Sequence, residues 1–129
     1  MSTASEEITN LLATYAKNTD GKFFLENTTK DFNFIRPSGN PIDAKGYAAM
    51  FESGDIVVTK LELTKLHKLD IFTDVAFAAL TMTGIFTYKG ELNNDVFTVS
   101  TILRLFDGVW KIGWMHRSSG TSDLSSWNT

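Results

Sequence analysis

The chain has 129 residues, of which 43% are apolar; it carries 12 Lys and Arg against 15 Asp and Glu, and it has no cysteine. Its length indicates one domain, residues 1–129, with enough buried surface for a core that needs no disulfides. A formal charge of −3 with only three arginines argues against nucleic-acid binding, and the lack of cysteine excludes disulfides, thiolate catalysis and cysteine-based metal sites.

The first third of the chain is predicted to be helical. A stripe of apolar residues at helical spacing defines the first helix: Ile8, Leu11, Leu12 and Tyr15. Thr3 and Glu6 have the spacing of a capping box, which places the start of this helix near residue 4. The stretch from Asn18 to Gly21 is expected to end it, and a short second helix is expected after Asp20.

A short strand and a third helix come next. Alternating residues in DFNFIR, residues 31–36, predict the strand, and PSGNP, residues 37–41, is a cluster of turn-forming residues. Asp43 can cap the third helix, which is expected to end at Gly54.

From Asp55 onward the apolar pattern has a period of two. Four long strands are predicted, over residues 56–72, 75–88, 95–106 and 109–119, with a bulge near Leu66. The joins between them are short: Thr73-Asp74, Lys89 to Asn94 and Asp107-Gly108. Consecutive strands with short joins form an antiparallel meander. We therefore predict an α+β fold in which N-terminal helices pack on one face of a curved antiparallel meander sheet.

The register of the last hairpin decides which residues of the closing stretch WMHRSSG share a face with the preceding strand. A two-residue turn at Asp107-Gly108 would place Trp114 and His116 beside the odd-numbered residues of that strand. A three-residue loop, Phe106-Asp107-Gly108, with Gly108 in the left-handed conformation would place Arg117 there instead. The residues alone leave both registers open.

This order of elements resembles the SnoaL-like group of the nuclear transport factor 2 superfamily, cone-shaped and cystatin-like α+β domains around a pocket. The resemblance covers nearly the whole chain and is carried by DFNFIRPSGNPIDAKGY and FTVSTILRLFDGVWKIGWMHRSSG. The second stretch is especially similar to the end of the association domain of calcium/calmodulin-dependent protein kinase II, where a DG turn, a Trp and an H-R-S-G ending recur. Metal-independent carbonic anhydrases of the iota class also end similarly, with two histidines where this chain has His116 and Arg117.

The resemblance implies that Arg117 lines the pocket and that Thr101 also faces it, which agrees only with the three-residue loop. In that register Ser119 and Met115 share the inner face. Tyr15 and Tyr47 could each add a hydroxyl to the pocket, although core positions are commoner for such tyrosines. The opposite face of the last strand would then present an apolar strip of the kind found at sheet-to-sheet subunit interfaces: Trp110, Ile112, Trp114 and His116.

Several charged residues are candidates for a functional role. Arg117 can bind a carboxylate or another anion, or it can pair with a nearby acidic residue. His116 could act as an acid or base, but this register points it outward, and His67 is also expected at the surface or an interface. Neither histidine has the spacing of a zinc site, so no metal or cofactor is expected. Asp31 and Arg36 could lie at the pocket mouth, although a solvated position is favoured.

Three functions agree with the sequence. The favoured one is an oligomer-forming domain, a homodimer or larger, that binds a small anionic or apolar ligand. The second is an acid–base enzyme, an isomerase, dehydratase or cyclase, with an inward carboxylate or histidine. The third is a metal-free hydratase for a substrate such as CO2, with a water held by Thr101 and Ser119. No apolar run approaches the ~20 residues that span a bilayer and no signal peptide is visible, so we expect a cytoplasmic protein without a membrane partner.

Overall fold

Three helices and one sheet make up the computed structural model, which describes residues 3–17 and 20–125. The helices are α1 (Ala4–Lys17), α2 (Gly21–Asn27) and α3 (Ala44–Ser53). At the start of α1, the backbone N–H of Glu6 donates to Oγ1 of Thr3 at 3.1 Å, which confirms the predicted capping box and helix start. The predicted end of this helix, Asn18 to Gly21, lies partly outside the described residues.

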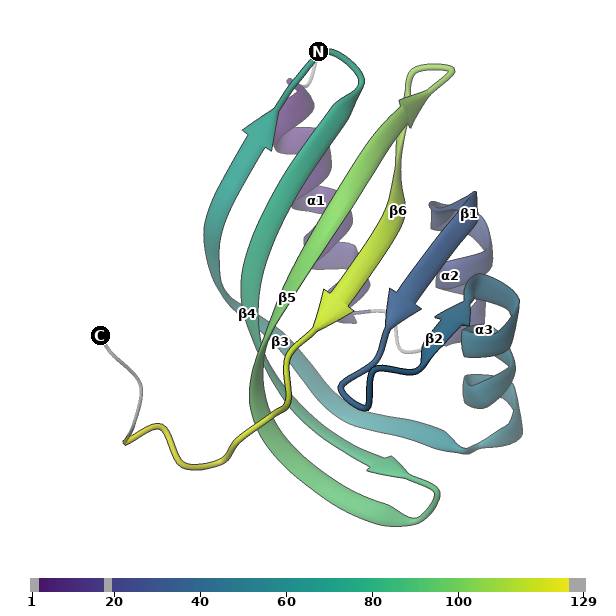
Figure 1. Ribbon diagram of the computed structural model, residues 1–129, viewed down its shortest axis with the longest axis vertical. Helices are drawn as coiled ribbons and strands as arrows, with labels where there is room; N and C mark the ends of the chain where they lie inside the picture. The colour runs from purple at the N-terminus through teal and green to yellow at the C-terminus, as the bar shows by residue number, and fades with distance from the viewer. Residues whose placement is uncertain (1–2, 18–19, 126–129) are drawn as a thin grey trace.

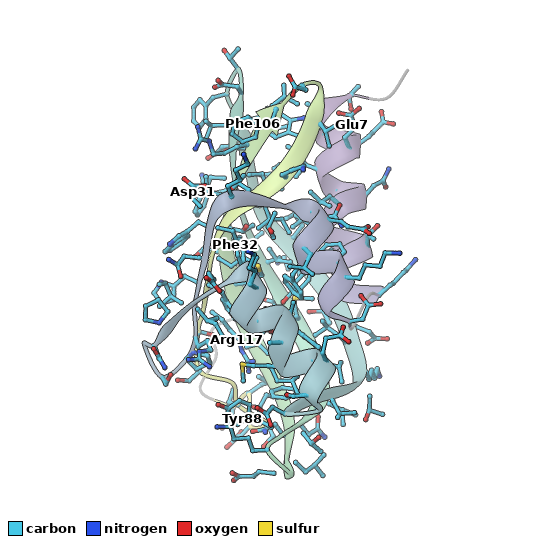
Figure 2. All side chains as sticks on the ribbon, turned by 90° about the vertical axis from the view of Figure 1, so that its right-hand side faces the viewer. Glu7, Asp31, Phe32, Tyr88, Phe106 and Arg117 are labelled. Carbon is cyan, nitrogen blue, oxygen red and sulfur yellow. The ribbon has the colours of Figure 1, made fainter. Side chains whose placement is uncertain are left out.

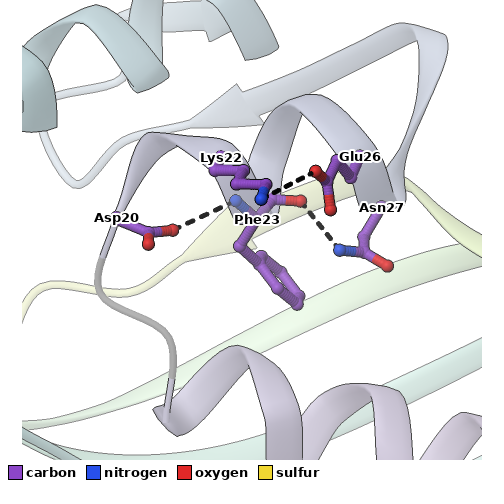
Figure 3. Close-up of polar contacts among 5 residues, drawn as sticks. All are labelled: Asp20, Lys22, Phe23, Glu26 and Asn27. Atoms are coloured by element: carbon purple, nitrogen blue, oxygen red, sulfur yellow. Dashed lines mark hydrogen bonds and ion pairs between the residues drawn. The ribbon is translucent and has the colours of Figure 1, made fainter.

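Side-chain contacts stabilise both ends of the short helix α2 (Figure 3). At its start, Asp20 accepts a hydrogen bond of 3.2 Å from the backbone N–H of Phe23, as predicted for a helix that begins after this aspartate. Lys22 and Glu26 form an exposed ion pair at 3.7 Å, and the Asn27 amide donates to the Phe23 carbonyl oxygen at 3.0 Å. A helix this short is not stable alone, so burial of Phe23 in the core also holds it in place.

The caps of α3 also agree with the sequence. Asp43 accepts a hydrogen bond of 2.7 Å from the backbone N–H of Gly46. The helix ends at Gly54, whose φ of 82° is the left-handed conformation that glycine adopts without strain. Both boundaries place the face of α3 that carries Tyr47 and Phe51 against the core.

Six strands form the sheet: β1 (Thr28–Ile35), β2 (Pro41–Asp43), β3 (Ile56–Ile71), β4 (Val75–Tyr88), β5 (Glu91–Phe106) and β6 (Val109–Arg117). Their spatial order is β2-β1-β6-β5-β4-β3. Strands β3 to β6 form the predicted antiparallel meander, whereas β1 pairs in parallel with β6 and makes the sheet mixed. In Figure 1, α1 crosses behind the meander, and α2 and α3 lie beside β1 and β2. The predicted α+β class, with helices on a curved sheet, is confirmed.

The β4–β5 and β5–β6 hairpins close with two-residue turns. The β4–β5 turn consists of Lys89 and Gly90, with φ of 50° and 84°, and not of Lys89 to Asn94 as predicted. The β5–β6 turn consists of Asp107 and Gly108, with φ of 50° and 78°. Positive φ at both central residues is characteristic of the type I′ turn, whose twist matches that of the flanking strands. The predicted three-residue loop at Phe106-Asp107-Gly108 is therefore wrong.

A bulge at Gly113 changes which residues of β6 face the core. Leu103 pairs with Ile112, but Val99 pairs with Arg117, so the register shifts by one residue between these two pairs. An extra residue in one strand reverses the alternation of side chains beyond it. The predicted neighbours of Arg117 are therefore present, although the extra residue is Gly113 and not a turn residue.

The outward orientation predicted for Trp110 and Ile112 is wrong. Both residues precede the bulge and face the core, with exposed fractions of 6% and 0%. Trp114 and His116 follow the bulge and lie on the outer face, where Trp114 is partly buried and His116 is exposed. The predicted apolar strip is thus limited to the last part of β6, and an interface role for Trp110 and Ile112 has no support.

Further bulges in β3 bend the sheet around the core. Its register against β4 shifts between Val58 and Lys60, between Leu63 and Lys65, and between Leu66 and Lys68. The last of these shifts is the bulge predicted near Leu66. Bulges kink a strand and increase its twist, which gives the sheet its concave face. The core on this face includes the fully buried side chains of Ile8, Leu12, Phe24, Phe32, Leu80 and Leu103.

Candidate functional site

A cavity of about 510 Å³ lies on the concave side of the sheet. Its walls come from all three helices, from β1 and the loop that follows it, from β3 to β5, and from the end of β6. Phenylalanine rings form much of this wall: Phe24, Phe34, Phe51, Phe86 and Phe97. Its ionisable side chains include Arg36, Glu91, Asp95 and Arg117. The cavity thus combines an aromatic wall with a few charges, as small-molecule sites commonly do.

Arg117, the last residue of β6, lines this cavity. Figure 2 places it in the same half of the molecule as Tyr88, which also lines the cavity. Its Cζ atom lies 3.7 Å from the centre of the Phe97 ring and 5.2 Å from the centre of the Phe86 ring. These are cation–π contacts, in which the positive charge lies over the negative faces of the rings. The guanidinium is therefore held by aromatic rings from β4 and β5.

The hydrogen-bond donors of Arg117 are not all paired. Its Nε atom is buried without a hydrogen-bond partner. Among residues 3–17 and 20–125, no carboxylate oxygen lies within 4.0 Å of the guanidinium nitrogens. Burial lowers the pKa of Arg117, and interactions with Tyr15, Tyr47 and Asp95 oppose this shift. A guanidinium stays protonated at neutral pH, so the cavity contains a cation with unused hydrogen-bonding capacity.

Two tyrosines bring hydroxyl groups to the same cavity. Tyr15 comes from α1 and Tyr47 from α3, and the Phe24 ring packs edge-on against both, with ring centres 5.8 and 4.7 Å apart. Burial raises the pKa of Tyr15 to about 12 and also raises the pKa of Tyr47, while the charge of Arg117 opposes both shifts. Both hydroxyls keep their protons at neutral pH and can donate a hydrogen bond to a bound group.

Acidic and amide side chains line the cavity on the β5 side, and sequence reasoning missed them. Glu91, Asn93 and Asp95 belong to the cavity wall and continue the inward row of odd-numbered residues in β5. The predicted loop from Lys89 to Asn94 concealed the start of this row, because it made the strand begin at residue 95 and not at Glu91. The adjacent Lys89-Gly90 pair could have revealed it, since such a pair suits a two-residue hairpin turn.

The segment after β6 passes closely over Asp95, and Figure 1 shows it running across β5. Val96 and Thr121 exchange backbone hydrogen bonds of 2.8 and 3.0 Å. A Cβ atom on Gly120 would lie 2.4 Å from Cβ and 2.7 Å from Oδ2 of Asp95. Only glycine, without a Cβ, allows this approach. One side of the Asp95 side chain is therefore covered by backbone, and the residue also borders the cavity.

The five residues predicted for the pocket divide into two groups. Arg117, Ser119 and Tyr47 line the cavity. Thr101 and Met115 face the same side of the sheet but are buried in the core, with exposed fractions of 0% and 2%, and do not border the cavity. The Thr101 hydroxyl donates a 2.7 Å hydrogen bond to a backbone carbonyl of β6. Its polar atom is thus satisfied within the protein and is not directed at a ligand.

Both histidines lie outside the cavity. His116 is exposed on the outer face, with its ring edge-on to Trp114 at 5.6 Å between ring centres. His67 is also exposed, and its Nε2 lies 2.6 Å from Oγ1 of Thr81. Within the described part of the chain, no group of three or more His, Cys, Asp or Glu is placed to hold a metal ion. In that same part, no helix is long and apolar enough to cross a membrane.

Asp31, within β1, and Arg36, directly after β1, have different positions. Arg36 lines the cavity, and its Nε donates to the backbone oxygen of Asn40 at 3.0 Å. Asp31 is exposed and does not line the cavity; Figure 2 places it toward the opposite end of the molecule from Arg117 and Tyr88. A hydrogen bond from the Thr29 hydroxyl lowers the pKa of Asp31. The solvated position favoured for Asp31 agrees with this placement.

The fold and the cavity place this chain among NTF2-like proteins. An NTF2-like protein of unknown function from Prochlorococcus marinus is 45% identical and superposes with a TM-score of 0.86, covering 98% of this chain and 100% of that chain. The family model "Protein of unknown function (DUF3804)" matches residues 3–128. The chain therefore belongs to the DUF3804 family within the NTF2-like group, and the predicted superfamily is confirmed.

More distant structures share the fold alone. An NTF2-like protein from Cytophaga hutchinsonii is 21% identical, with a TM-score of 0.82 and coverage of 92% of this chain and 99% of that chain. A candidate calcium/calmodulin-dependent kinase II association domain from Exiguobacterium sibiricum is 16% identical, with a TM-score of 0.79 and coverage of 95% and 98%. A search of curated proteins found no match.

Proposed function

We propose that this protein binds a small organic anion with an apolar body in the cavity, and that Arg117 is the anion-binding group. One observation carries the proposal: the guanidinium of Arg117 is buried against Phe97 while its Nε lacks a partner. Leaving buried polar groups of a cation unpaired is costly. A carboxylate would supply the missing acceptors in the bidentate geometry that arginine favours.

The remaining lining supports the same ligand chemistry. The protonated hydroxyls of Tyr15 and Tyr47 can donate to an anionic oxygen. Rings such as Phe34 and Phe51 offer apolar surface for the body of the ligand. A purely structural Arg117 would instead be expected to pair with an acidic residue, and the described residues provide none within ion-pair distance.

Isothermal titration calorimetry with 3-phenylpropionate and its uncharged analogue 3-phenylpropanamide tests this proposal. We expect the wild-type protein to bind the carboxylate at least tenfold more tightly than the amide, and Arg117→Met to lose this difference. Arg36→Met is the matched control, because Arg36 lines the same cavity but already donates to Asn40. Equal binding of both probes by the wild type, or binding of neither, would contradict the proposal.

Self-association through the outer face of the sheet is part of the same proposal. Trp114 pairs across the strands with Ile102, and the exposed His116 ring packs against it. Trp114 and Ile102 border a hollow of about 340 Å³ that Asp31 and Arg104 flank with opposite charges. A homodimer or larger oligomer would cover this surface. Light scattering after size-exclusion chromatography tests it, and a monomer at micromolar concentration would oppose it.

A cytoplasmic location also belongs to the proposal. It is supported by the complete lack of cysteine, which is compatible with a reducing compartment. Fractionation of cells that express the protein, followed by immunoblotting, tests it. Recovery in the membrane or secreted fraction would contradict it.

Acid–base catalysis is a second candidate, favoured by the position of Asp95. An inward carboxylate beside apolar walls is what such an enzyme requires, and Asp95 borders the cavity together with Phe97. Proton abstraction from carbon would exchange that proton with solvent. Loss of a ligand C–H signal in D2O by proton NMR, abolished in Asp95→Asn, would support this function. The hydratase alternative has no such support, since Thr101 donates its hydroxyl to the backbone and lies outside the cavity.

A further inference from the structure

The charged side chains of the cavity are balanced in sign. Arg36 and Arg117 supply two positive charges, and Glu91 and Asp95 supply two negative ones. Among the described residues, no lysine or histidine belongs to the lining. A site for a simple anion is expected to have an excess of positive charge, because binding sites complement the charge of their ligands. A lining without net formal charge fits a ligand that also has none, or one with separate positive and negative groups.

The charges of Arg117 and Asp95 are close enough to interact, because Asp95 opposes the lowering of the Arg117 pKa by burial. The guanidinium of Arg117 lies over the Phe97 ring, 3.7 Å from its centre. Asp95 stands two residues before Phe97 on the same strand and therefore on the same face, a Cα separation of roughly 7 Å. Both residues line the cavity, yet within the described part of the chain they form no ion pair.

Rotation of the Asp95 side chain is also restricted. The backbone of Gly120 passes so close that an added Cβ would meet Cβ, Cγ and Oδ2 of Asp95. Hydrogen bonds between Val96 and Thr121 fix that backbone in place. Likewise, the rings of Phe97 and Phe86 fix the guanidinium of Arg117. Two opposite charges are thus presented from rigid positions without neutralising each other by contact, which is the arrangement expected of a preorganised site.

We propose that the natural ligand is a small zwitterion, such as an amino acid with an apolar side chain. Its carboxylate binds the guanidinium of Arg117, its ammonium group binds the carboxylate of Asp95, and its apolar body lies against the aromatic wall. This inference rests on the proposed function, because it requires Arg117 to bind a carboxylate in the cavity. It adds the second recognition element, Asp95, and restricts the ligand class.

The balance of charges also explains why a zwitterion is favoured over a simple carboxylate. Binding a carboxylate alone would bring a negative charge toward Asp95, which repels it. A zwitterion replaces that repulsion with an attraction, and its carboxylate gives the guanidinium of Arg117 an acceptor in the same step. Charge-assisted hydrogen bonds of this type are shorter and stronger than neutral ones. Asp95 therefore selects against simple carboxylates as well as for zwitterions.

Three probes with one carbon skeleton test the inference: phenylalanine, 3-phenylpropionate and 2-phenylethylamine. In calorimetric titrations of the full-length wild type, we expect phenylalanine to bind at least tenfold more tightly than either of the others. Asp95→Asn should remove the advantage of phenylalanine over 3-phenylpropionate and leave 3-phenylpropionate binding unchanged or tighter. Asp31→Asn, an isosteric change at an exposed residue outside the cavity, serves as the matched control. Circular dichroism of each variant verifies that the fold is retained.

The outcomes separate the inference from the function on which it rests. Tight binding of 3-phenylpropionate with no gain for phenylalanine, unchanged by Asp95→Asn, overturns the zwitterion inference and leaves the anion-binding function intact. Failure of the wild type to bind any of the three probes overturns both. Binding of 2-phenylethylamine as tight as that of phenylalanine overturns both as well, because the carboxylate would then contribute nothing.

Discussion

The Cζ atom of Arg117 lies 3.7 Å from the centre of the Phe97 ring, so this cavity holds a positive charge on an aromatic face and not on a carboxylate. The position depends on Gly113, whose bulge turns the end of β6 toward the concave side of the sheet. Aromatic rings stabilise this charge, and no acidic residue lies within ion-pair distance among the described residues. Substitution of Arg117 therefore tests its contribution to stability and to ligand binding separately.

Replacing Arg117 with methionine should leave the stability of the protein almost unchanged. The lost cation–π contacts, about 0.5–2 kcal/mol each, are offset by the relief of burying a charge whose Nε has no partner. We expect the free energy of unfolding in urea to change by about 1 kcal/mol or less. A loss of about 3–5 kcal/mol, typical of breaking a buried ion pair, would show that Arg117 has a structural partner.

Adding a methyl group at Gly120 should damage both the fold and the cavity. The new Cβ would approach Cβ of Asp95 to 2.4 Å, and this atom is fixed to the backbone of β5, so the segment after β6 must move away. We expect Gly120→Ala to lower the free energy of unfolding by about 1–3 kcal/mol, as overpacking does. Urea unfolding followed by tryptophan fluorescence measures this change.

Ser119→Ala is the control for the Gly120 substitution. Ser119 is exposed, and its backbone oxygen, which accepts a hydrogen bond from the Ser118 hydroxyl, is unaffected by the change. Its free energy of unfolding should stay within about 0.5 kcal/mol of the wild type. If Gly120→Ala were as harmless as Ser119→Ala, the segment would be free to lift from Asp95, and the rigid position of that carboxylate would be refuted.

The fold was predictable from the sequence because its signals are local. Thr3 with Glu6, Asp20 and Asp43 mark helix starts by their side-chain chemistry, and the period of two marks the long strands. Gly113 has only a weak signal, because a lone glycine inside a strand is compatible with a bulge but does not require one. A bulge inside a regular apolar strand is decided by how the two strands pack along their whole length, so the sequence could not show where the alternation of β6 reverses.

The cavity was only partly predictable for a related reason. The resemblance and the register that agrees with it predicted Arg117 and Ser119, whereas Asp95 was not predicted although it begins the predicted strand 95–106 and lies on the same face as Phe97. The pocket of such a fold is assembled from residues far apart in the chain, so spacing along the sequence does not reveal which of them meet. Arg117 and Asp95 line one cavity because they lie on the same face of neighbouring strands, and no spacing along the sequence displays this.

Substitution of the two tryptophans of β6 should affect different properties of the protein. Trp110 is 6% exposed in the core, so Trp110→Ala should lower the free energy of unfolding by about 3–5 kcal/mol. Trp114 lies on the outer face after the bulge, and Trp114→Ala should mainly weaken self-association. Urea unfolding and light scattering measure the two effects. An unchanged oligomeric mass in Trp114→Ala would place the subunit interface elsewhere.

Alkaline conditions should weaken the folded state through Tyr15. Burial raises the pKa of its hydroxyl from 10.0 to about 12, so both folded and unfolded chains keep this proton below pH 10. Between pH 10 and 12 the unfolded chain releases the proton and the folded protein retains it. The contribution of Tyr15 to the free energy of unfolding therefore falls as pH rises, by at most about 1.4 kcal/mol per pH unit.

Tyr15→Phe removes this contribution and should flatten the pH dependence. Urea unfolding at pH 9, 10 and 11 in both proteins isolates it, because the other titrating groups are common to the two and cancel in the difference. Below pH 9 the difference between the proteins should be constant, since neither state of the wild type has lost the Tyr15 proton. Parallel curves up to pH 11 would mean that this hydroxyl reaches solvent in the folded protein, and its role as a protonated donor in the cavity would have to be abandoned.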